Sequence, residues 1–326
     1  MHLLPNISFY FPKKNLSNKE LCRIFDTTEA KILKNTGIKN RYISAKDELA
    51  SDMAVMAAEN FFKENKKDRK EIDFLIFCSE CYDFIAPATS CLLQDRLGLS
   101  KTIGCVDLPY GCSGYVYGLA MAKGFIASGI AKNILFITAD TSSKTLAKDN
   151  LELRSIFSDA ASVTLITAEN SRAIGEFVFG TDGSGSKNLY VSNSGFRKSG
   201  TKKSEKKELP NGKMVMDGTE ILNFGLREVP KLVNDTLKKN KLALEDIDLF
   251  IFHQPTRFML EVIRKKMNVP HEKIFINIEK RGNTVSTTIP LALKDAEKAG
   301  KIKSGMNILL AGFGIGYSWA GTILKT

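Results

Sequence analysis

The segments EIDFLIFCSE (residues 71–80) and DIDLFIFHQP (residues 246–255) are two versions of one pattern, and this repetition decides the fold. In both, Ile-Asp precedes a nearly unbroken apolar strand, and a helix with a proline near its start is expected to follow. A second pair, SGIAKNILFITAD and KSGMNILLAGFG, follows at nearly the same distance in each case. Because the period is far too long for a solenoid, the repetition indicates two duplicated halves.

The strands of both halves are continuous apolar runs, which are typical of sheets covered by helices on both faces. Strand-like and helical runs alternate throughout the 326 residues, as they do in α/β proteins. We therefore expect an α/β protein in the form of a layered α/β/α/β/α sandwich made of two duplicated halves. The halves are expected to span residues 1–170 and 171–326, with the boundary at LITAENSRAIGEF.

The composition, 43% hydrophobic and 25% charged, is ordinary for a globular protein. No apolar run is long enough to cross a membrane, and the N-terminal segment lacks the features of a signal peptide, so a cytoplasmic location without membrane association is expected. Much of the net charge of +11 lies in FRKSGTKKSEKKELPNGK (residues 196–213), either a solvated loop or a site for an acidic partner. Base-stacking aromatics are not interleaved with these lysines, which argues against nucleic acid.

Two of the six cysteines, Cys78 and Cys81, form a C-x-x-C motif at the end of the first repeated strand. Neither a second such motif nor a pair of histidines follows to complete a zinc site. The motif also ends a strand instead of opening a helix, unlike a redox motif. We therefore expect these two side chains to serve core packing and no metal to be bound.

Cys112 stands between two glycines in DLPYGCSGYVYGLAMA, where an apolar run becomes a helix of small residues. The positive end of a helix dipole favours a thiolate at such a position. Gly111 and Gly114 permit a sharp turn and open a path to the sulfur. The alternative is a small buried hydrophobic residue without a chemical role.

Candidate partners for this cysteine come from the second half. His253 directly follows the apolar run LFIF, whereas His2 lies at the terminus and His271 in a polar turn. Asn283 precedes another helix of small residues. The structural alternatives are a buried histidine with satisfied hydrogen bonds and an asparagine N-cap. The segment GFGIGYSW (residues 312–319) is not followed by the Lys-Ser/Thr of a phosphate loop, so its glycines are expected to let a backbone N–H approach a substrate oxygen.

Over nearly its whole length the chain resembles β-ketoacyl-acyl carrier protein synthase III of the thiolase-like superfamily. DLPYGCSGYVYGLAMA, FHQPTR, RGNTVSTTIPLAL and GFGIGYSWAGTIL occur in the order seen in that family. The resemblance implies the thiolase-like fold and a catalytic set of Cys112, His253 and Asn283. Hydroxymethylglutaryl-CoA synthases would carry an additional catalytic glutamate near the first-half motifs. Thiolases would carry a second cysteine near the C-terminal glycines, and GFGIGYSW has none.

The reaction that the resemblance implies has two stages and requires no metal or redox cofactor. Cys112 first takes an acyl group from a thioester, while the backbone N–H groups of Cys112 and Gly316 hold the oxyanion. Malonyl-acyl carrier protein then loses carbon dioxide, and His253 and Asn283 stabilise the enolate as N–H donors. The resulting carbanion attacks the acyl-cysteine and forms a carbon–carbon bond.

Other positions are assigned through the same resemblance. The expected substrate contacts are Ala86, Thr219, Phe313 and Gly314. The acidic carrier protein is expected to dock on Arg257, Arg264, Lys265 and Lys266. The alternative is that these four residues only form an exposed helix face. Lys31, Asn35 and Leu151 replace the Trp and two Arg that often clamp the adenine of coenzyme A, which favours an acyl-carrier donor over acyl-CoA. Ala86 replaces a Phe that limits the acyl pocket, which allows a primer longer than acetyl or branched.

Two other readings stay open, and the assembly is also inferred from the resemblance. Relatives with the same cysteine pass an acyl group to an oxygen or nitrogen nucleophile, with the histidine as general base and Asn283 dispensable. A non-catalytic partner that binds the carrier protein is the second alternative. Family members are generally homodimers paired through the N-terminal half, so an interface around Ile85 and Cys105 is expected.

Overall fold

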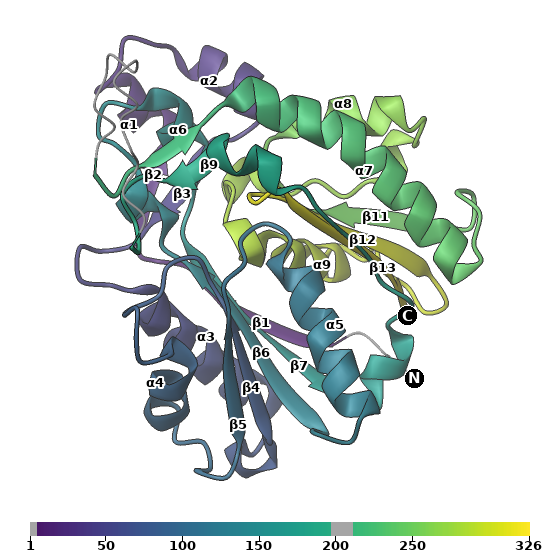
Figure 1. The fold of residues 1–326 in the computed structure, drawn as a ribbon. Helices are drawn as coiled ribbons and strands as arrows, with labels where there is room; N and C mark the ends of the chain where they lie inside the picture. Colours follow the sequence, from purple (N-terminus) through teal and green to yellow (C-terminus); the bar gives the residue numbers. More distant parts are fainter. Residues whose placement is uncertain (1–4, 197–210) are drawn as a thin grey trace.

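The computed structural model describes residues 5–196 and 211–326, which form two main sheets with helices below, between and above them (Figure 1). The first sheet has the order β1-β7-β6-β4-β5 and the second the order β11-β12-β13-β8. The strands of the first sheet are β1 (Asn6–Tyr10), β4 (Phe74–Cys78), β5 (Gly104–Leu108), β6 (Asn133–Asp140) and β7 (Ala160–Thr167). Those of the second are β8 (Val178–Thr181), β11 (Leu249–Phe252), β12 (Asn307–Gly314) and β13 (Ser318–Lys325). Two small ribbons pair β2 (Lys14–Ser17) with β3 (Asn40–Ile43) and β9 (Leu189–Val191) with β10 (Met214–Met216).

The helices form three layers around the two sheets, which confirms the predicted sandwich. The outer face of the first sheet is covered by α3 (Ala50–Asn65) and α4 (Thr89–Arg96). Between the sheets lie α5 (Gly114–Ala127) and α9 (Thr288–Lys298). The outer face of the second sheet is covered by α7 (Gly218–Asn240) and α8 (Arg257–Lys266). The short helices α1 (Asn18–Cys22), α2 (Glu29–Thr36) and α6 (Leu151–Ile156) pack together at one edge of the molecule.

The two sheets repeat the same pairing pattern. In the first, β4 is parallel to β6, which is antiparallel to β7, and β7 is antiparallel to β1. In the second, β11, β12, β13 and β8 repeat these three pairings in the same order. The repeated sequence segments therefore occupy equivalent strands, β4 with β11 and β6 with β12. First-sheet strands end at residue 167 and second-sheet strands begin at residue 178; the division into domains 1–170 and 171–326 stays a prediction.

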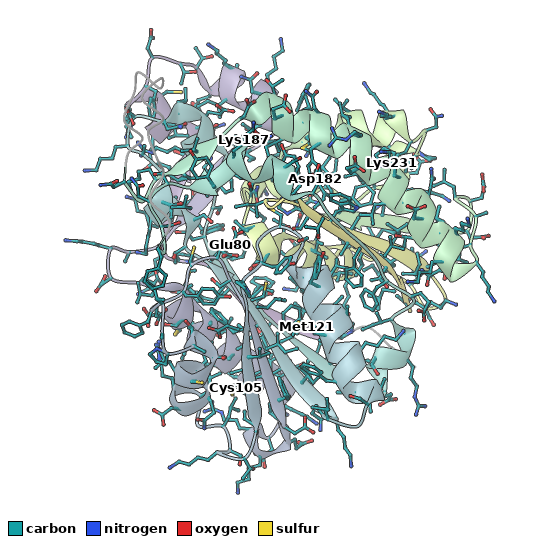
Figure 2. All side chains as sticks on the ribbon, in the orientation of Figure 1. Glu80, Cys105, Met121, Asp182, Lys187 and Lys231 are labelled. Carbon is teal, nitrogen blue, oxygen red and sulfur yellow. The ribbon has the colours of Figure 1, made fainter. Side chains whose placement is uncertain are left out.

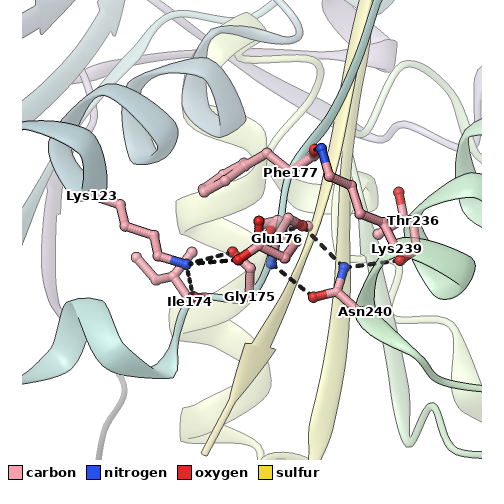
Figure 3. Close-up of polar contacts among 9 residues, drawn as sticks. Lys123, Ile174, Gly175, Glu176, Phe177, Thr236, Lys239 and Asn240 are labelled. Atoms are coloured by element: carbon pink, nitrogen blue, oxygen red, sulfur yellow. Dashed lines mark hydrogen bonds and ion pairs between the residues drawn. The ribbon is translucent and has the colours of Figure 1, made fainter. Parts of the chain in front are cut away.

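The connection between the two sheets is fastened on both sides (Figure 3). Lys123 of α5 donates from Nζ to the carbonyl oxygens of Ile174 at 2.7 Å and Gly175 at 2.9 Å. At the end of α7, Asn240 accepts from the Glu176 backbone N–H at 2.8 Å and donates to its carbonyl at 3.0 Å. The linker is thus bonded both to the central helix layer and to the outer helix of the second half.

The central helix α5 can lie between two sheets because small residues face its neighbours. A Cβ atom on Gly118 would come within 2.1 Å of the Phe136 ring. We expect Gly118→Ala to lower the free energy of unfolding by about 1–3 kcal/mol through overpacking. Gly124→Ala in the same helix meets open space and should be neutral or stabilise by up to about 1 kcal/mol. Urea denaturation of both variants measures the difference, and equal effects would contradict this account.

Some expectations from the sequence concern parts of the chain away from the strands. His2 and most of the lysine-rich segment 196–213 lie outside the described residues. Within the described ranges, the helices are all too short or too polar to traverse a lipid bilayer. All six cysteines are free thiols; Cys78 is buried and its thiol donates to the Tyr110 carbonyl at 3.1 Å.

Candidate active site

Cys112, His253 and Asn283 line one pocket of about 620 Å³. They come from both halves of the chain, and each is largely buried, with 6%, 1% and 4% of its surface exposed. The pocket floor is therefore screened from bulk water while remaining connected to a cavity large enough for an extended substrate arm. The structure brings together the three residues that sequence reasoning selected as a set.

The turn that carries Cys112 is held between the two halves. Its hydrogen bond runs from the Gly114 N–H to the Gly111 carbonyl at 2.8 Å, just before α5 begins. A Cβ atom on Gly314 of β12 would lie 2.6 Å from the Cys112 Cβ, and one on Gly312 would lie 2.8 Å from the Ser113 Cα. Both positions need glycine, because the second-half strand passes directly against the turn.

The electrostatic setting of Cys112 differs from the expectation of a stabilised thiolate. Burial, followed by repulsion from the Glu80 carboxylate, raises the pKa of the Cys112 thiol. The N–H groups of Ile315 and of Cys112 itself point at the sulfur and act in the opposite direction. Because Cys112 lies two residues before α5 and is buried, loss of solvation outweighs the helix dipole.

His253 follows β11 and continues its pairing, since the His253 N–H donates to the Ala311 carbonyl at 2.8 Å. Its Nδ1 lies 2.8 Å from the Thr288 hydroxyl, which donates its own proton to the Val285 carbonyl at 3.0 Å. Thr288 therefore fixes the ring through Nδ1, which leaves Nε2 as the ring nitrogen available to a substrate in the pocket. Burial lowers the pKa of His253 to about 3, so the imidazole is neutral near pH 7.

Asn283 belongs to the second half, but its backbone is bonded to the first. Its N–H donates to the Ile156 carbonyl and its carbonyl accepts from the Ser158 N–H, both at 2.9 Å. The side-chain Oδ1 accepts from the Val285 N–H at 2.9 Å. The amide is thereby oriented with its oxygen engaged, which leaves the Nδ2 donor for the pocket.

Comparisons with known proteins agree with this geometry. A family model for 3-oxoacyl-[acyl-carrier-protein] synthase III matches residues 106–183, and the model for its C-terminal part matches residues 237–326. A beta-ketoacyl-[acyl-carrier-protein] synthase III from Halalkalibacterium halodurans is 35% identical, with 98% of this chain and 95% of the relative covered. The chain belongs to this synthase III family. The relative from Fusobacterium nucleatum is 32% identical over 99% of this chain and 98% of its own. A crystal structure of a 3-oxoacyl-(acyl-carrier-protein) synthase III superposes with a TM-score of 0.94, at 40% identity and 99% coverage of both chains.

The remaining substrate positions predicted from the synthase III resemblance divide into two groups. Lining the same pocket are Thr219, Phe313 and Gly314, together with Lys31, Asn35 and Leu151, the three that replace the adenine clamp. The Phe313 ring packs edge-on against the His253 ring, with centroids 5.8 Å apart. Ala86 lies outside the pocket, in an exposed segment after β4. Gly316 was predicted to supply a backbone N–H for the oxyanion. The backbone N–H that points at the Cys112 sulfur is that of Ile315, the residue before it.

The four basic residues predicted for docking are not equally available. Arg264 is 16% exposed and is engaged with Glu261 at 2.9 Å and the Val269 carbonyl at 2.7 Å. Arg257 is half-buried against α2. Lys265 and Lys266 are exposed at the end of α8. These two lysines are thus the members of the set that a partner protein can reach.

Two residues near the site were missed by sequence reasoning. Phe258 of α8 is 51% exposed and lines the pocket. The signal in the sequence was an aromatic residue outside the set of positions that this helix buries. Glu80 follows β4 and acts on the Cys112 thiol. The signal for Glu80 was a charged residue at the carboxyl end of a buried strand.

Proposed function

We propose that this protein is a synthase III-type condensing enzyme, which joins an acyl thioester to malonyl-acyl carrier protein with loss of carbon dioxide. The pathway class is fatty acid or related acyl-chain biosynthesis. The observation that carries the proposal is the convergence of Cys112, His253 and Asn283 on one pocket in a chain of the synthase III family. No metal or redox cofactor takes part in the proposed chemistry.

In the first stage Cys112 takes the acyl group. The sulfur–proton bond breaks, a bond forms between Sγ and the acyl carbon, and the donor leaves as a thiol. The N–H groups of Cys112 and Gly316 are proposed to stabilise the oxyanion, with the Ile315 N–H as an additional donor because of its direction toward the sulfur. Apolar side chains around Cys112 suit a hydrocarbon acyl group: Leu146, Leu189, Met214 and Ile315.

In the second stage the malonyl thioester loses carbon dioxide, and negative charge builds on its carbonyl oxygen. Nδ2 of Asn283 and Nε2 of His253 are the proposed donors to this oxygen. The Thr288 hydroxyl donates to the Val285 carbonyl, and this arrangement places the proton of neutral His253 on Nδ1. For Nε2 to donate to the enolate oxygen, the hydroxyl must turn and donate to Nδ1 instead, so the mechanism requires that tautomer. The carbanion then attacks the acyl carbon, a carbon–carbon bond forms, the Sγ–C bond breaks, and Cys112 leaves as the thiolate, which takes up a proton from solvent.

The pocket entrance favours an acyl-carrier donor over acyl-CoA. Lys31, Asn35 and Leu151 supply neither an aromatic platform nor a guanidinium pair for an adenine nucleotide. Phe258 offers an exposed apolar contact at the start of α8, two helical turns before Lys265 and Lys266. An acidic carrier protein with an apolar contact surface fits this combination.

We also propose a cytoplasmic homodimer. Phe84 and Ile85 are 58% and 74% exposed in the single chain and lie beside Ala86. Cys105 is on β5, the edge strand of the first sheet (Figure 2). Covering this exposed apolar segment with a second copy would remove it from water. Ala86 of each copy would then be buried in the dimer interface.

Release of carbon dioxide tests the proposed reaction. The protein is incubated with malonyl-acyl carrier protein and a panel of acyl-carrier and acyl-CoA donors, and the 3-oxoacyl product is identified by mass spectrometry. Condensation yields one carbon dioxide for each product. Acyl transfer to an oxygen or nitrogen nucleophile without carbon dioxide would replace this proposal, and failure of Cys112 to accept an acyl group would favour a non-catalytic role.

Charge reversal on α8 tests the carrier-docking surface. Lys265→Glu combined with Lys266→Glu should raise the KM for malonyl-carrier roughly three- to tenfold at low salt, because exposed charge pairs each contribute a fraction of a kcal/mol. Lys301→Glu combined with Lys303→Glu is the matched control, since this loop precedes the amino end of β12, away from the pocket. Docking that stays undiminished in both variants and at high salt would contradict the electrostatic contribution.

A further inference from the structure

Glu80 places a carboxyl group against the turn that presents the Cys112 thiol. It follows β4, and Figure 2 labels it at the carboxyl edge of the first sheet, facing the second half. A Cβ atom added to Gly111 would lie 2.5 Å from the Glu80 carboxyl group, so the carboxyl packs directly on the residue before Cys112. The Glu80 backbone N–H donates to Asp140 Oδ1 at 2.8 Å, which anchors the segment.

Asp140 is the second carboxyl group of this cluster. It is fully buried at the end of β6 and accepts hydrogen bonds from Ser286 Oγ at 2.5 Å and from Ser79 Oγ at 3.4 Å. Burial raises the pKa of both carboxyls, and repulsion from Asp140 adds to the rise at Glu80. Glu80 itself is exposed in the single chain, so the repulsion from buried Asp140 is the cause of its raised pKa that the geometry supports.

The other titratable groups around Glu80 carry no charge near neutral pH. Burial raises the pKa of the Cys78 and Cys81 thiols and of the Tyr82 phenol, so all three stay protonated. The negative charges of Glu80 and Asp140 both raise the pKa of the Cys112 thiol, Glu80 more than Asp140. Asp140 is committed to four hydrogen bonds, three of them to Ser286 and Ser79. The carboxyl free to exchange a proton is that of Glu80.

Acyl uptake needs a proton acceptor that the Cys–His–Asn set supplies poorly. The Cys112 thiol must lose its proton as it attacks, and its burial opposes ionisation. His253 is a weak base because burial holds its pKa near 3, and the Asn283 amide does not titrate. A general base is most effective when its pKa lies near the working pH, and the raised pKa of Glu80 moves that carboxyl toward it.

We propose that Glu80 is a second acid–base group of this site, which accepts the Cys112 thiol proton, directly or through one water, and returns it to the departing donor thiol. The balance is complete: the Sγ–H and donor C–S bonds break, the Sγ–C bond forms, and the donor sulfur receives the proton. The inference rests on acyl uptake in the proposed function. It does not require that condensation follows.

Acyl loading of the whole protein, followed by intact mass, tests the inference. The probe is a short acyl thioester of N-acetylcysteamine, and the rate is measured from about pH 5 to about pH 10. Glu80→Gln should lower the loading rate about 10²-fold or more and remove one ionisation from the pH profile. Glu80→Asp, which keeps a carboxyl group, should recover part of the rate. Glu59→Gln, a remote charge loss on α3, should keep the wild-type profile.

Alkylation of Cys112 by iodoacetamide provides a readout that needs no acyl donor. Removing the negative charge of Glu80 should shift the pH midpoint of alkylation downward, because the thiolate is no longer repelled. The expected result is therefore slower acyl loading together with alkylation at lower pH. Loading that is unchanged or faster in Glu80→Gln, or an unshifted alkylation midpoint, overturns the proposal. Wild-type loading without carbon dioxide release would instead refute the condensation reaction and leave the role of Glu80 standing.

Discussion

Replacing Cys112 with alanine should abolish acyl uptake and lower condensation by at least about 10³-fold, the scale seen when a nucleophile is removed from a catalytic set. The reason is that Cys112 is the proposed nucleophilic sulfur, in the pocket that His253 and Asn283 also line. The measurement is intact mass after exposure to acyl thioesters, combined with product formation from malonyl-carrier.

The control for this experiment is Cys91→Ala. Cys91 is exposed on α4, at the outer face of the first sheet, so its loss should leave loading and condensation unchanged. Acylation that persists in Cys112→Ala at wild-type level would move the nucleophile elsewhere and would remove the basis of the proposed reaction.

Replacing Asn283 with aspartate should lower carbon dioxide release about 10²- to 10³-fold while acyl loading of Cys112 continues. Aspartate keeps the oxygen that accepts from the Val285 N–H at 2.9 Å, so the local turn is preserved. What is lost is the Nδ2 donor, and a negative charge faces the developing enolate. Loading by mass spectrometry and carbon dioxide release are measured on the same preparation.

The outcome separates the two enzyme readings. If Asn283→Asp loses only the decarboxylating stage, an enolate forms and the reaction is a condensation. If full turnover persists, Asn283 is dispensable and transfer to an oxygen or nitrogen nucleophile is the better account. Asn283→Ala, which also frees the Val285 N–H, shows whether loss of the turn adds a separate defect in thermal stability.

The fold could be predicted because the pattern of apolar strands and following helices is visible in short segments and occurs in both halves of the chain. The apolar strands around Phe77 and Ile251 are continuous, and each is followed by a helix, so the pattern of a doubly covered sheet is visible without tertiary knowledge. The polar residues Cys112 and His253 could be selected because they stand at strand ends. That edge collects functional side chains in parallel sheets.

The electrostatics of the site and the availability of its charged side chains depend on contacts between segments that are distant in the sequence, and the spacing of residues does not reveal these contacts. The raised pKa of Cys112 follows from the depth of the pocket, not from its place before a helix. Arg264 was expected on a docking face, but Glu261 and the Val269 carbonyl occupy its guanidinium group. The Glu80 carboxyl group lies against Gly111, a contact between residues 31 positions apart that their spacing does not reveal.

The bonds that cross between the halves have a consequence for protein engineering. Asn283 is bonded through its backbone to Ile156 and Ser158, and the Ser113 and Ser318 hydroxyls meet at 2.7 Å. Chimeras that join the first half of one relative to the second half of another would have to preserve every one of these hydrogen bonds. Substrate range in this scaffold is therefore more readily altered by grafting entrance residues than by exchanging halves.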